Sequence, residues 1–221
     1  MSVLSQTYDK LTIDTPEKLN AIAPDVSDCL RLLDGQLLYF PNFLAANAES
    51  IYHLLQQHLA WQEWQIKMFG KMVTIPRLQA WYGDADARYK YSGMIMQPRP
   101  WHWSLMGIKE QCQQVAKCRF NSVLANWYRH QQDSMGWHSD NEKELGDKPV
   151  IASLSFGHPR RFCLRNKSSG EKLQIALKSG SLLLMRGNVQ NEWQHAVPKS
   201  TKAMAGRINL TYRMIKQPAD E

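Results

Sequence analysis

The sequence lacks any long hydrophobic stretch. No uninterrupted apolar run reaches the roughly 18 residues that a membrane-spanning helix needs. The N-terminus, MSVLSQTYDKLTIDTPEKL, mixes polar and charged residues where a secretory signal would need an apolar centre. We therefore expect no membrane association and a cytoplasmic protein, or a nuclear one in a eukaryote.

Cysteine is also scarce. The chain has 4 cysteines, and the closest two, Cys112 and Cys118, are six positions apart with no CxxC pair. This number and spacing exclude a disulfide framework and favour a reducing compartment. Internal repeats and low-complexity tracts are absent as well.

What is present suits one globular domain. The chain has 221 residues, 43% of them hydrophobic, enough for a core that needs no crosslinks. Its 27 basic and 20 acidic side chains give a net charge of +7, which favours a polyanionic partner such as nucleic acid. Many basic proteins bind no nucleic acid, so the charge by itself does not decide the function. We expect a monomer.

The first part of the chain differs from the rest. Residues 1–35 have poor periodicity and end in a turn signal, so they read as an N-terminal arm or cap. Residues 36–221 read as the single main domain. Within it, the stretches 46–60 and 104–118 repeat apolar residues at helical spacing, which predicts two amphipathic helices that pack on a sheet.

The second half of the chain changes character to β structure. Short runs rich in β-forming residues are separated by glycine and asparagine turns, without helices between them. This pattern predicts a mainly β (α+β) protein built as an antiparallel sandwich or barrel. The predicted strands lie near 122–129, 149–156, 161–165, 172–177, 181–186 and 207–214.

Three residues form a candidate metal site. His138 and Asp140 follow a β run, and residues two apart in an extended chain point to the same face. His195 lies 57 positions later, just after a predicted strand, in a loop that can aim its side chain across a barrel mouth. Two histidines and one carboxylate on one side of a metal are typical of non-haem iron(II) oxygenases. The competing interpretation is a chance HxD pair and a structural histidine.

The last predicted strand carries two arginines on one face, Arg207 and Arg213. A dicarboxylate such as 2-oxoglutarate, bound inside a barrel, would explain them, because guanidinium groups pair with carboxylates through two hydrogen bonds. Asn126 and Tyr128 share a face of an earlier strand and could bind the remaining oxygens. The simpler alternative is an edge strand with solvent-facing arginines.

Taken together, these motifs resemble the AlkB family of iron(II)- and 2-oxoglutarate-dependent dioxygenases. The order is NxY at 126–128, HxD at 138–140, His195, and RxNLTxR at 207–213. The resemblance extends over about 36–215. The segments 69–93 and 151–157 further resemble the branch of the family that acts on double-stranded DNA.

The resemblance implies a fold and a set of ligands. The fold would be a double-stranded β-helix (jelly-roll) with its core at about 120–215, N-terminal helices on the sheet and a nucleotide-recognition lid at about 62–100. The cofactors would be Fe(II), 2-oxoglutarate as co-substrate, and O2. In this interpretation the iron ligands and catalytic residues are His138, Asp140 and His195, and the 2-oxoglutarate contacts are Asn126, Tyr128, Arg207, Asn209 and Arg213.

The implied reaction is repair of alkylated DNA. It removes methyl groups oxidatively from bases such as 1-methyladenine and 3-methylcytosine and releases formaldehyde and succinate. A damaged base would be flipped out of the duplex and stacked between aromatic rings. The residues assigned to the substrate are Phe69, Arg77, Tyr89, Tyr91, Ser92 and Glu142, with His138 on one face of the base.

Two of these assignments have particular reasons. Phe69 stands beside Gly70 and between lysines in a predicted hairpin tip, where a large aromatic ring could wedge into a base stack. Asn141, after the metal aspartate, departs from the acid that related enzymes often have there, and Glu142 could replace it in reading an exocyclic amine. This departure concerns the base preference and leaves the reaction class unaffected.

Other functions stay open at this stage. A related 2-oxoglutarate oxygenase could act on protein, lipid or single-stranded RNA, because the triad and the arginines do not identify the substrate, but the lid segment argues against it. Alkylated double-stranded DNA is the favoured partner, with single-stranded DNA or RNA as the alternatives. A non-catalytic DNA-binding protein would be expected to lack a metal ligand or an arginine, and none is missing. A zinc deaminase would need an HxE and a PCxxC motif, which the sequence lacks.

Overall fold

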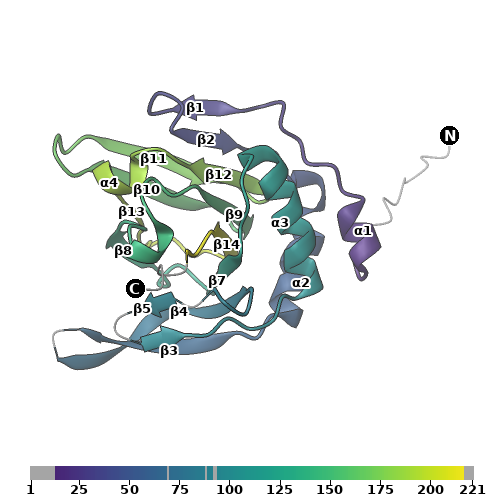
Figure 1. Ribbon diagram of the computed structural model, residues 1–221, viewed down its shortest axis with the longest axis horizontal. Helices are drawn as coiled ribbons and strands as arrows, with labels where there is room; N and C mark the ends of the chain where they lie inside the picture. The colour runs from purple at the N-terminus through teal and green to yellow at the C-terminus, as the bar shows by residue number, and fades with distance from the viewer. Residues whose placement is uncertain (1–12, 69, 88, 92–93, 217–221) are drawn as a thin grey trace.

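Two antiparallel sheets form the body of the protein (Figure 1). The computed structural model describes residues 13–68, 70–87, 89–91 and 94–216. The large sheet contains, in spatial order, β1 (Leu30–Leu32), β2 (Leu37–Phe40), β12 (Ser181–Met185), β9 (Ile151–Gly157), β14 (Arg207–Arg213), β7 (Ser122–Tyr128), β4 (Lys71–Gly83) and β3 (Gln62–Met68). The small sheet contains β11 (Lys172–Leu177), β10 (Arg160–Asn166), β13 (Trp193–Val197) and β8 (Met135–His138).

The two sheets face each other across a shared apolar cluster. Leu183 and Met185 of the large sheet belong to the same buried cluster as Phe162 and Leu164 of the small sheet. A third sheet has two antiparallel strands, β5 (Tyr89–Tyr91) and β6 (Met94–Met96), and lies in the region of the sequence that we expected to be the lid. The predicted mainly β, jelly-roll fold is confirmed.

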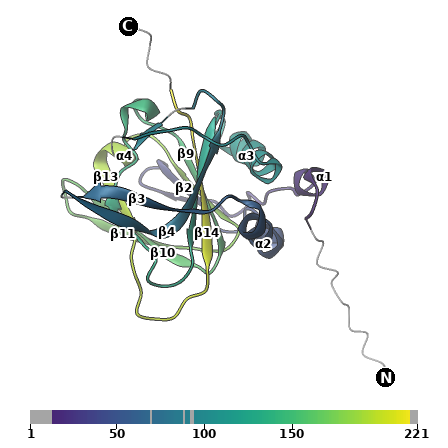
Figure 2. The same ribbon diagram turned by 90° about the horizontal axis from the view of Figure 1, so that it is seen from below.

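The long helices α2 (Ala48–His58) and α3 (Trp103–Ala116) cover the outer face of the large sheet, with α1 (Pro16–Asn20) against α3 (Figure 2). The short elements are the 3-10 turns η1 (Ala45–Asn47) and η2 (Lys143–Leu145) and the helix α4 (Val189–Glu192), whose Val189 packs in the cluster between the sheets. Both long helices fall where apolar residues repeat at helical spacing, as predicted. The side chain of His102 accepts a hydrogen bond from the backbone N–H of Ser104 and so caps the start of α3. Within the described residues, no helix is long and apolar enough to span a membrane.

The central strand β14 separates the hydrophobic core from a polar interior. It pairs with β9 on one side and β7 on the other, and all seven of its residues are buried. Because side chains alternate along a strand, Ile208, Leu210 and Tyr212 pack under the helices. The intervening polar residues, Arg207 and Arg213 among them, line the space between the sheets. The alternative of an exposed edge strand is wrong.

The second half of the chain has two strands outside the ranges that we predicted, β8 and β13, although we expected a β run just before the HxD motif. Both are short and contain polar residues, so they lack the apolar alternation that identifies a strand. Pairing with β10 and with each other holds them in the small sheet. Our prediction that His195 follows a strand in a loop is wrong, because it lies in the middle of β13.

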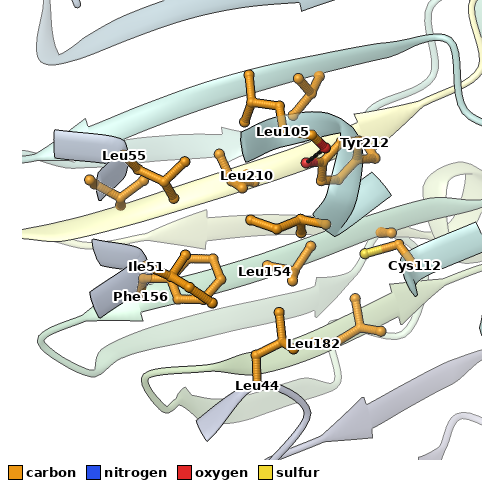
Figure 3. Packing of buried hydrophobic residues seen from close by; sticks show 14 of the residues in the cluster. Leu44, Ile51, Leu55, Leu105, Cys112, Leu154, Phe156, Leu182, Leu210 and Tyr212 are labelled. Atoms are coloured by element: carbon orange, nitrogen blue, oxygen red, sulfur yellow. Dashed lines mark hydrogen bonds between the residues drawn. The ribbon is translucent and has the colours of Figure 1, made fainter. Parts of the chain in front are cut away.

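Figure 3 shows the core between the helices and the large sheet. Leu210 and Leu154 project from neighbouring strands towards α2 and α3, and the hydroxyl of Tyr212 donates a hydrogen bond of 2.8 Å to the backbone carbonyl of Leu105. This bond is buried, so it joins α3 to the central strand at a fixed position.

We predict that Tyr212→Phe lowers the free energy of unfolding by about 0.5–1.5 kcal/mol, because one buried hydrogen bond is lost while the ring remains. Leu210→Ala should cost more, about 2–5 kcal/mol, because it leaves a cavity. Urea unfolding with unchanged m-values measures both losses. A Tyr212→Phe protein as stable as the wild type would show that the bond does not anchor α3.

Candidate metal centre and its cavity

Three side chains converge at one end of the space between the sheets. His138, Asp140 and His195 offer ligand atoms that all lie within 4.8 Å of one another. The Nε2 atom of His138 lies 3.8 Å from one oxygen of Asp140, and the Nε2 atom of His195 lies 4.0 Å from the other. The two imidazole rings meet edge to face, with centroids 4.2 Å apart. This is a compact set of two nitrogens and one carboxylate, as a facial metal site requires.

The backbone around the first two ligands is held by hydrogen bonds. Nδ1 of His138 lies 2.9 Å from the carbonyl oxygen of Gly136, and because a carbonyl only accepts, Nδ1 must be the protonated nitrogen. Nε2 therefore keeps its lone pair for a metal. Asp140 lies beyond the end of β8, where its backbone N–H donates to the side-chain oxygen of Gln190 at 2.9 Å. The loop, and not the strand alternation we expected, orients this carboxylate.

His195 is buried, and its surroundings favour the neutral form. It faces His138 across the β13–β8 pair and lies against the ring of Phe162, with centroids 5.2 Å apart. Burial, together with the nearby His138, lowers the pKa of His195 to about 3. The imidazole is therefore neutral at neutral pH, the form in which one ring nitrogen has a lone pair available for a metal.

Asp140 keeps its charge although it is buried. Burial by itself would raise its pKa, but the charge of Arg213, followed by the two histidines, outweighs burial and holds the pKa of Asp140 well below its usual value. Nη2 of Arg213 lies 2.9 Å from one carboxylate oxygen of Asp140. The predicted metal ligand Asp140 and Arg213 of β14 thus form one ion pair.

A cavity of about 150 Å³ opens beside this triad. Arginine side chains in its wall outnumber carboxylates, three to two. A divalent metal would add two positive charges, so the site needs an anionic ligand to be balanced. The charged residues that line the cavity are Arg77, Arg207, Arg213, Asp140 and Glu142.

Comparison with known proteins identifies the chain. Residues 36–213 match the 2OG-Fe(II) oxygenase superfamily. The chain is 40% identical over 178 residues to alpha-ketoglutarate-dependent dioxygenase alkB homolog 3 of Bos taurus, covering 76% of this chain and 62% of that protein. It is 36% identical over 184 residues to DNA oxidative demethylase ALKBH2 of Homo sapiens, covering 78% of this chain and 70% of that protein. The chain belongs to the AlkB family.

The solved structure titled "The structure of OsALKBH1" has the same fold. It covers 85% of this AlkB-family chain and 100% of its own, with a TM-score of 0.62 and 16% sequence identity. The matches to alkB homolog 3 of cattle, human, mouse and rat each cover less than two thirds of the relative, from 52% to 66%.

The AlkB family implies Fe(II), 2-oxoglutarate and O2, and the residues present fit them. Arg207 is 1% exposed, and only its Nη2 has a partner among the described residues, the hydroxyl of Ser155 at 2.8 Å. Its Nε and Nη1 atoms are buried without an acceptor, which an incoming carboxylate would supply. Burial lowers the pKa of Arg207 to about 10, so the group stays charged at neutral pH.

The two asparagines that we predicted to contact 2-oxoglutarate differ in their bonding. Both N–H donors of Asn209 are used, by Ser153 and the Leu154 carbonyl, and its oxygen accepts from Thr211. Asn209 therefore braces the cavity wall. Asn126, opposite it on β7, receives hydrogen bonds on its oxygen only.

The predicted 2-oxoglutarate residues all line one cavity with the predicted iron ligands. The residues predicted to bind the substrate are more scattered. Arg77 and Glu142 also line this cavity, and Arg77 is only 4% exposed. Tyr89 and Tyr91 lie on β5, of which the backbone alone is described. Phe69 and Ser92 lie outside the described residues.

Sequence reasoning missed several residues that support the site. Gln190 fixes the backbone of Asp140, and the hydroxyl of Ser139 donates to the carbonyl of Trp193, which ties the metal loop to β13. Gln79 enters the cavity from β4, directly across from Asn126. Alternation along β4 could have suggested Gln79, but nothing local marks Gln190 as a neighbour of a residue 50 positions away.

We predict that Asp140→Ala lowers the affinity for Mn(II), a redox-stable substitute for Fe(II), by a factor of about a hundred or more, because one of three ligands is lost. Calorimetric titration of metal-free protein measures this, with Asp147→Ala, an exposed acid of the same loop, as the matched control. Asp140→Asn preserves the shape of the side chain and controls for folding. Wild-type metal affinity in both Asp140 variants would show that this carboxylate is not a ligand.

Proposed function

We propose that this chain removes alkyl groups from nucleic-acid bases by oxidative dealkylation, with alkylated DNA as its substrate. The cavity that joins a two-histidine, one-carboxylate triad to the incompletely satisfied Arg207 carries the proposal. Relatives named DNA oxidative demethylase, 36% identical over 184 residues, support DNA as the substrate. Because the chain covers less than two thirds of several relatives, the substrate is a proposal for this chain.

Iron(II), 2-oxoglutarate and O2 together supply an oxidant strong enough to hydroxylate an N-alkyl carbon. One oxygen atom enters the alkyl carbon and the other enters succinate, while the C1 carboxylate of 2-oxoglutarate leaves as CO2. The C–N bond of the N–CH2OH group then breaks, its hydroxyl loses a proton, and formaldehyde leaves. The electron pair of the broken bond stays on the nitrogen, either as a lone pair or as an N–H bond once a proton is added. The base returns to its unmodified form.

The protein's own part is to bind, orient and shield. Arg213 touches Asp140, so a carboxylate that it binds would lie beside the metal. Arg207, six residues earlier on β14, would hold the opposite carboxylate near Tyr128, whose ring centroid lies 5.1 Å from the guanidinium carbon. Two arginines at the two ends of a cavity match the two carboxylates of 2-oxoglutarate.

A second hollow beside the first suits a flat base. It measures about 460 Å³, and Trp64, Ile66, Met72 and Trp81 supply its apolar wall. Trp81 pairs across the sheet with Leu124, which lines the metal cavity, so the two hollows are neighbours. Aromatic walls stack on bases without regard to sequence, as a repair enzyme needs.

Glu142 would read the exocyclic amine of the damaged base. Its Oε2 atom is buried, lines the metal cavity and has no hydrogen-bond partner among the described residues. An acceptor in this position favours a base with an amino donor, such as 1-methyladenine or 3-methylcytosine. Glu142 therefore supports our assignment despite Asn141 next to the metal ligand.

We infer further that double-stranded DNA is preferred. The β3–β4 hairpin projects from the body of the protein (Figure 1), and its strands pair as far as Met68 with Lys71. Met72 and Val73 near its end are exposed apolar residues, which suits contact with stacked bases. Phe69 lies outside the described residues, and its role as a wedge remains our proposal. We also retain a monomer as our prediction, which light scattering on the purified protein checks.

We predict demethylation of oligonucleotides that contain 1-methyladenine or 3-methylcytosine in the presence of Fe(II), ascorbate and 2-oxoglutarate. Mass spectrometry should detect loss of the methyl group, with formaldehyde and succinate in equal amounts. Asp140→Ala and an oligonucleotide without a lesion are the negative controls. Succinate formed without demethylation of DNA would contradict the proposal, and activity on methylated RNA alone would favour the RNA alternative.

We predict that Phe69→Ala lowers activity on double-stranded substrate by about tenfold, because a wedge that replaces stacking contributes about 1–3 kcal/mol. Activity on single strands should largely survive, since no stack has to be opened. The same variant is assayed on both substrates, with thermal stability as the folding control. Equal losses on both substrates would favour a packing role for Phe69.

A further inference from the structure

The amide of Asn126 is held in one orientation by two neighbours on β4. Nε of Arg77 donates to its Oδ1 atom at 2.7 Å, and Nε2 of Gln79 donates to the same oxygen at 2.9 Å. All three side chains are buried, with exposed fractions of 4%, 2% and 6% for Arg77, Gln79 and Asn126. Their positions follow from the register, because Gln79 pairs directly with Asn126 and Arg77 lies two residues away on the same face.

The identity of the donors removes the usual ambiguity of an amide. A guanidinium can only donate, so the atom of Asn126 that faces Arg77 must be the oxygen. The nitrogen of Asn126 then points away from Arg77. No described residue accepts a hydrogen bond from it, and Asn126 lines the same cavity as Arg207. The cavity therefore receives an N–H donor where an anionic ligand is expected.

Arg77 is itself fixed on two further sides. Its Nη1 atom donates to the carbonyl of Ser134 at 3.0 Å, and its guanidinium carbon lies 5.9 Å from the ring centroid of Tyr128. A side chain with these contacts and 4% exposure is not free to reach a DNA backbone. Its contacts fit a role inside the cavity better than the contact with substrate that we expected.

We propose that Arg77 is a positioning residue for the co-substrate, which locks the Asn126 amide so that its nitrogen donates to a carboxylate of 2-oxoglutarate. Gln79 assists through the second hydrogen bond to the same oxygen. The inference rests on the proposed function only in taking 2-oxoglutarate as the ligand. It does not depend on which nucleic acid is the substrate.

The first test is direct binding of 2-oxoglutarate to the Mn(II)-loaded protein, measured by calorimetry without nucleic acid. Arg77→Met should weaken binding about tenfold, because the amide loses its main constraint, while Mn(II) affinity stays within twofold. Arg165→Met, an arginine of the small sheet that lies over Trp137 outside the cavity, is the matched control. Unchanged binding by Arg77→Met would overturn the proposal.

Asn126→Asp separates positioning from packing. The new carboxylate still accepts from Arg77 and Gln79, so thermal stability should be equal or higher, yet it offers no donor and repels the co-substrate. Binding of 2-oxoglutarate should fall about a hundredfold or more. This variant keeps the proposal testable if Arg77→Met folds poorly. Retained binding with an intact fold would show that the amide nitrogen contacts no ligand.

A double-mutant cycle tests whether Arg77 acts through Asn126. In an Asn126→Ala background, Arg77→Met should change 2-oxoglutarate affinity by less than about twofold, because no amide remains to be oriented. A full tenfold effect in that background would mean that Arg77 acts independently and would overturn the mechanism.

Kinetics and DNA binding give the final distinction. Arg77→Met should raise the KM for 2-oxoglutarate about tenfold with kcat within about twofold, and its affinity for methylated DNA should stay within twofold. Lost DNA affinity with normal co-substrate binding would identify Arg77 as a DNA contact and overturn the proposal. A failure of DNA demethylation in the wild type would leave the calorimetric result unaffected, so the two proposals fail separately.

Discussion

The ion pair between Arg213 and Asp140 is the interaction on which the site depends. Arg213 comes from β14, the strand with neighbours on both sides at the centre of the large sheet, and Asp140 comes from a loop after β8 of the small sheet. Burial would neutralise Asp140, and the arginine prevents this. Because each charge needs the other, the ion pair joins β14 to the loop after β8 across the cavity between the sheets.

The other two predicted metal ligands, His138 and His195, are positioned by the pairing of strands in the small sheet. His195 on β13 and His138 on β8 are cross-strand partners, so the small sheet holds both rings close together. Burial keeps His195 neutral, and the Gly136 carbonyl selects the tautomer of His138. His195 and Asp140 are thus already in the neutral and the ionised form, respectively, that binds a metal.

Polar residues in the cavity wall differ in how many of their hydrogen-bonding groups have partners. Asn209 has both of its N–H donors hydrogen-bonded to protein atoms. Arg207, Asn126 and Glu142 keep unused donors or acceptors that face the cavity. Since a buried polar group without a partner is costly, we propose that ligands bind at these residues. The donors gather where a carboxylate would lie, and the acceptor of Glu142 suits the amine of a base.

The family could be predicted from the sequence, because HxD and two arginines on one strand face are local patterns with a specific chemistry, and one later histidine completes the ligand set. The two long helices and most strands could be predicted too, because their apolar periodicity is strong. The fold was needed to show that His195 lies within a strand, that a loop held by Gln190 orients Asp140, and that Arg77 is buried beside Asn126. Each of these features depends on contacts between segments about 50 residues apart in the sequence. The periodicity of one segment holds no information about such contacts, so it cannot predict which amide atom of Asn126 faces Arg77.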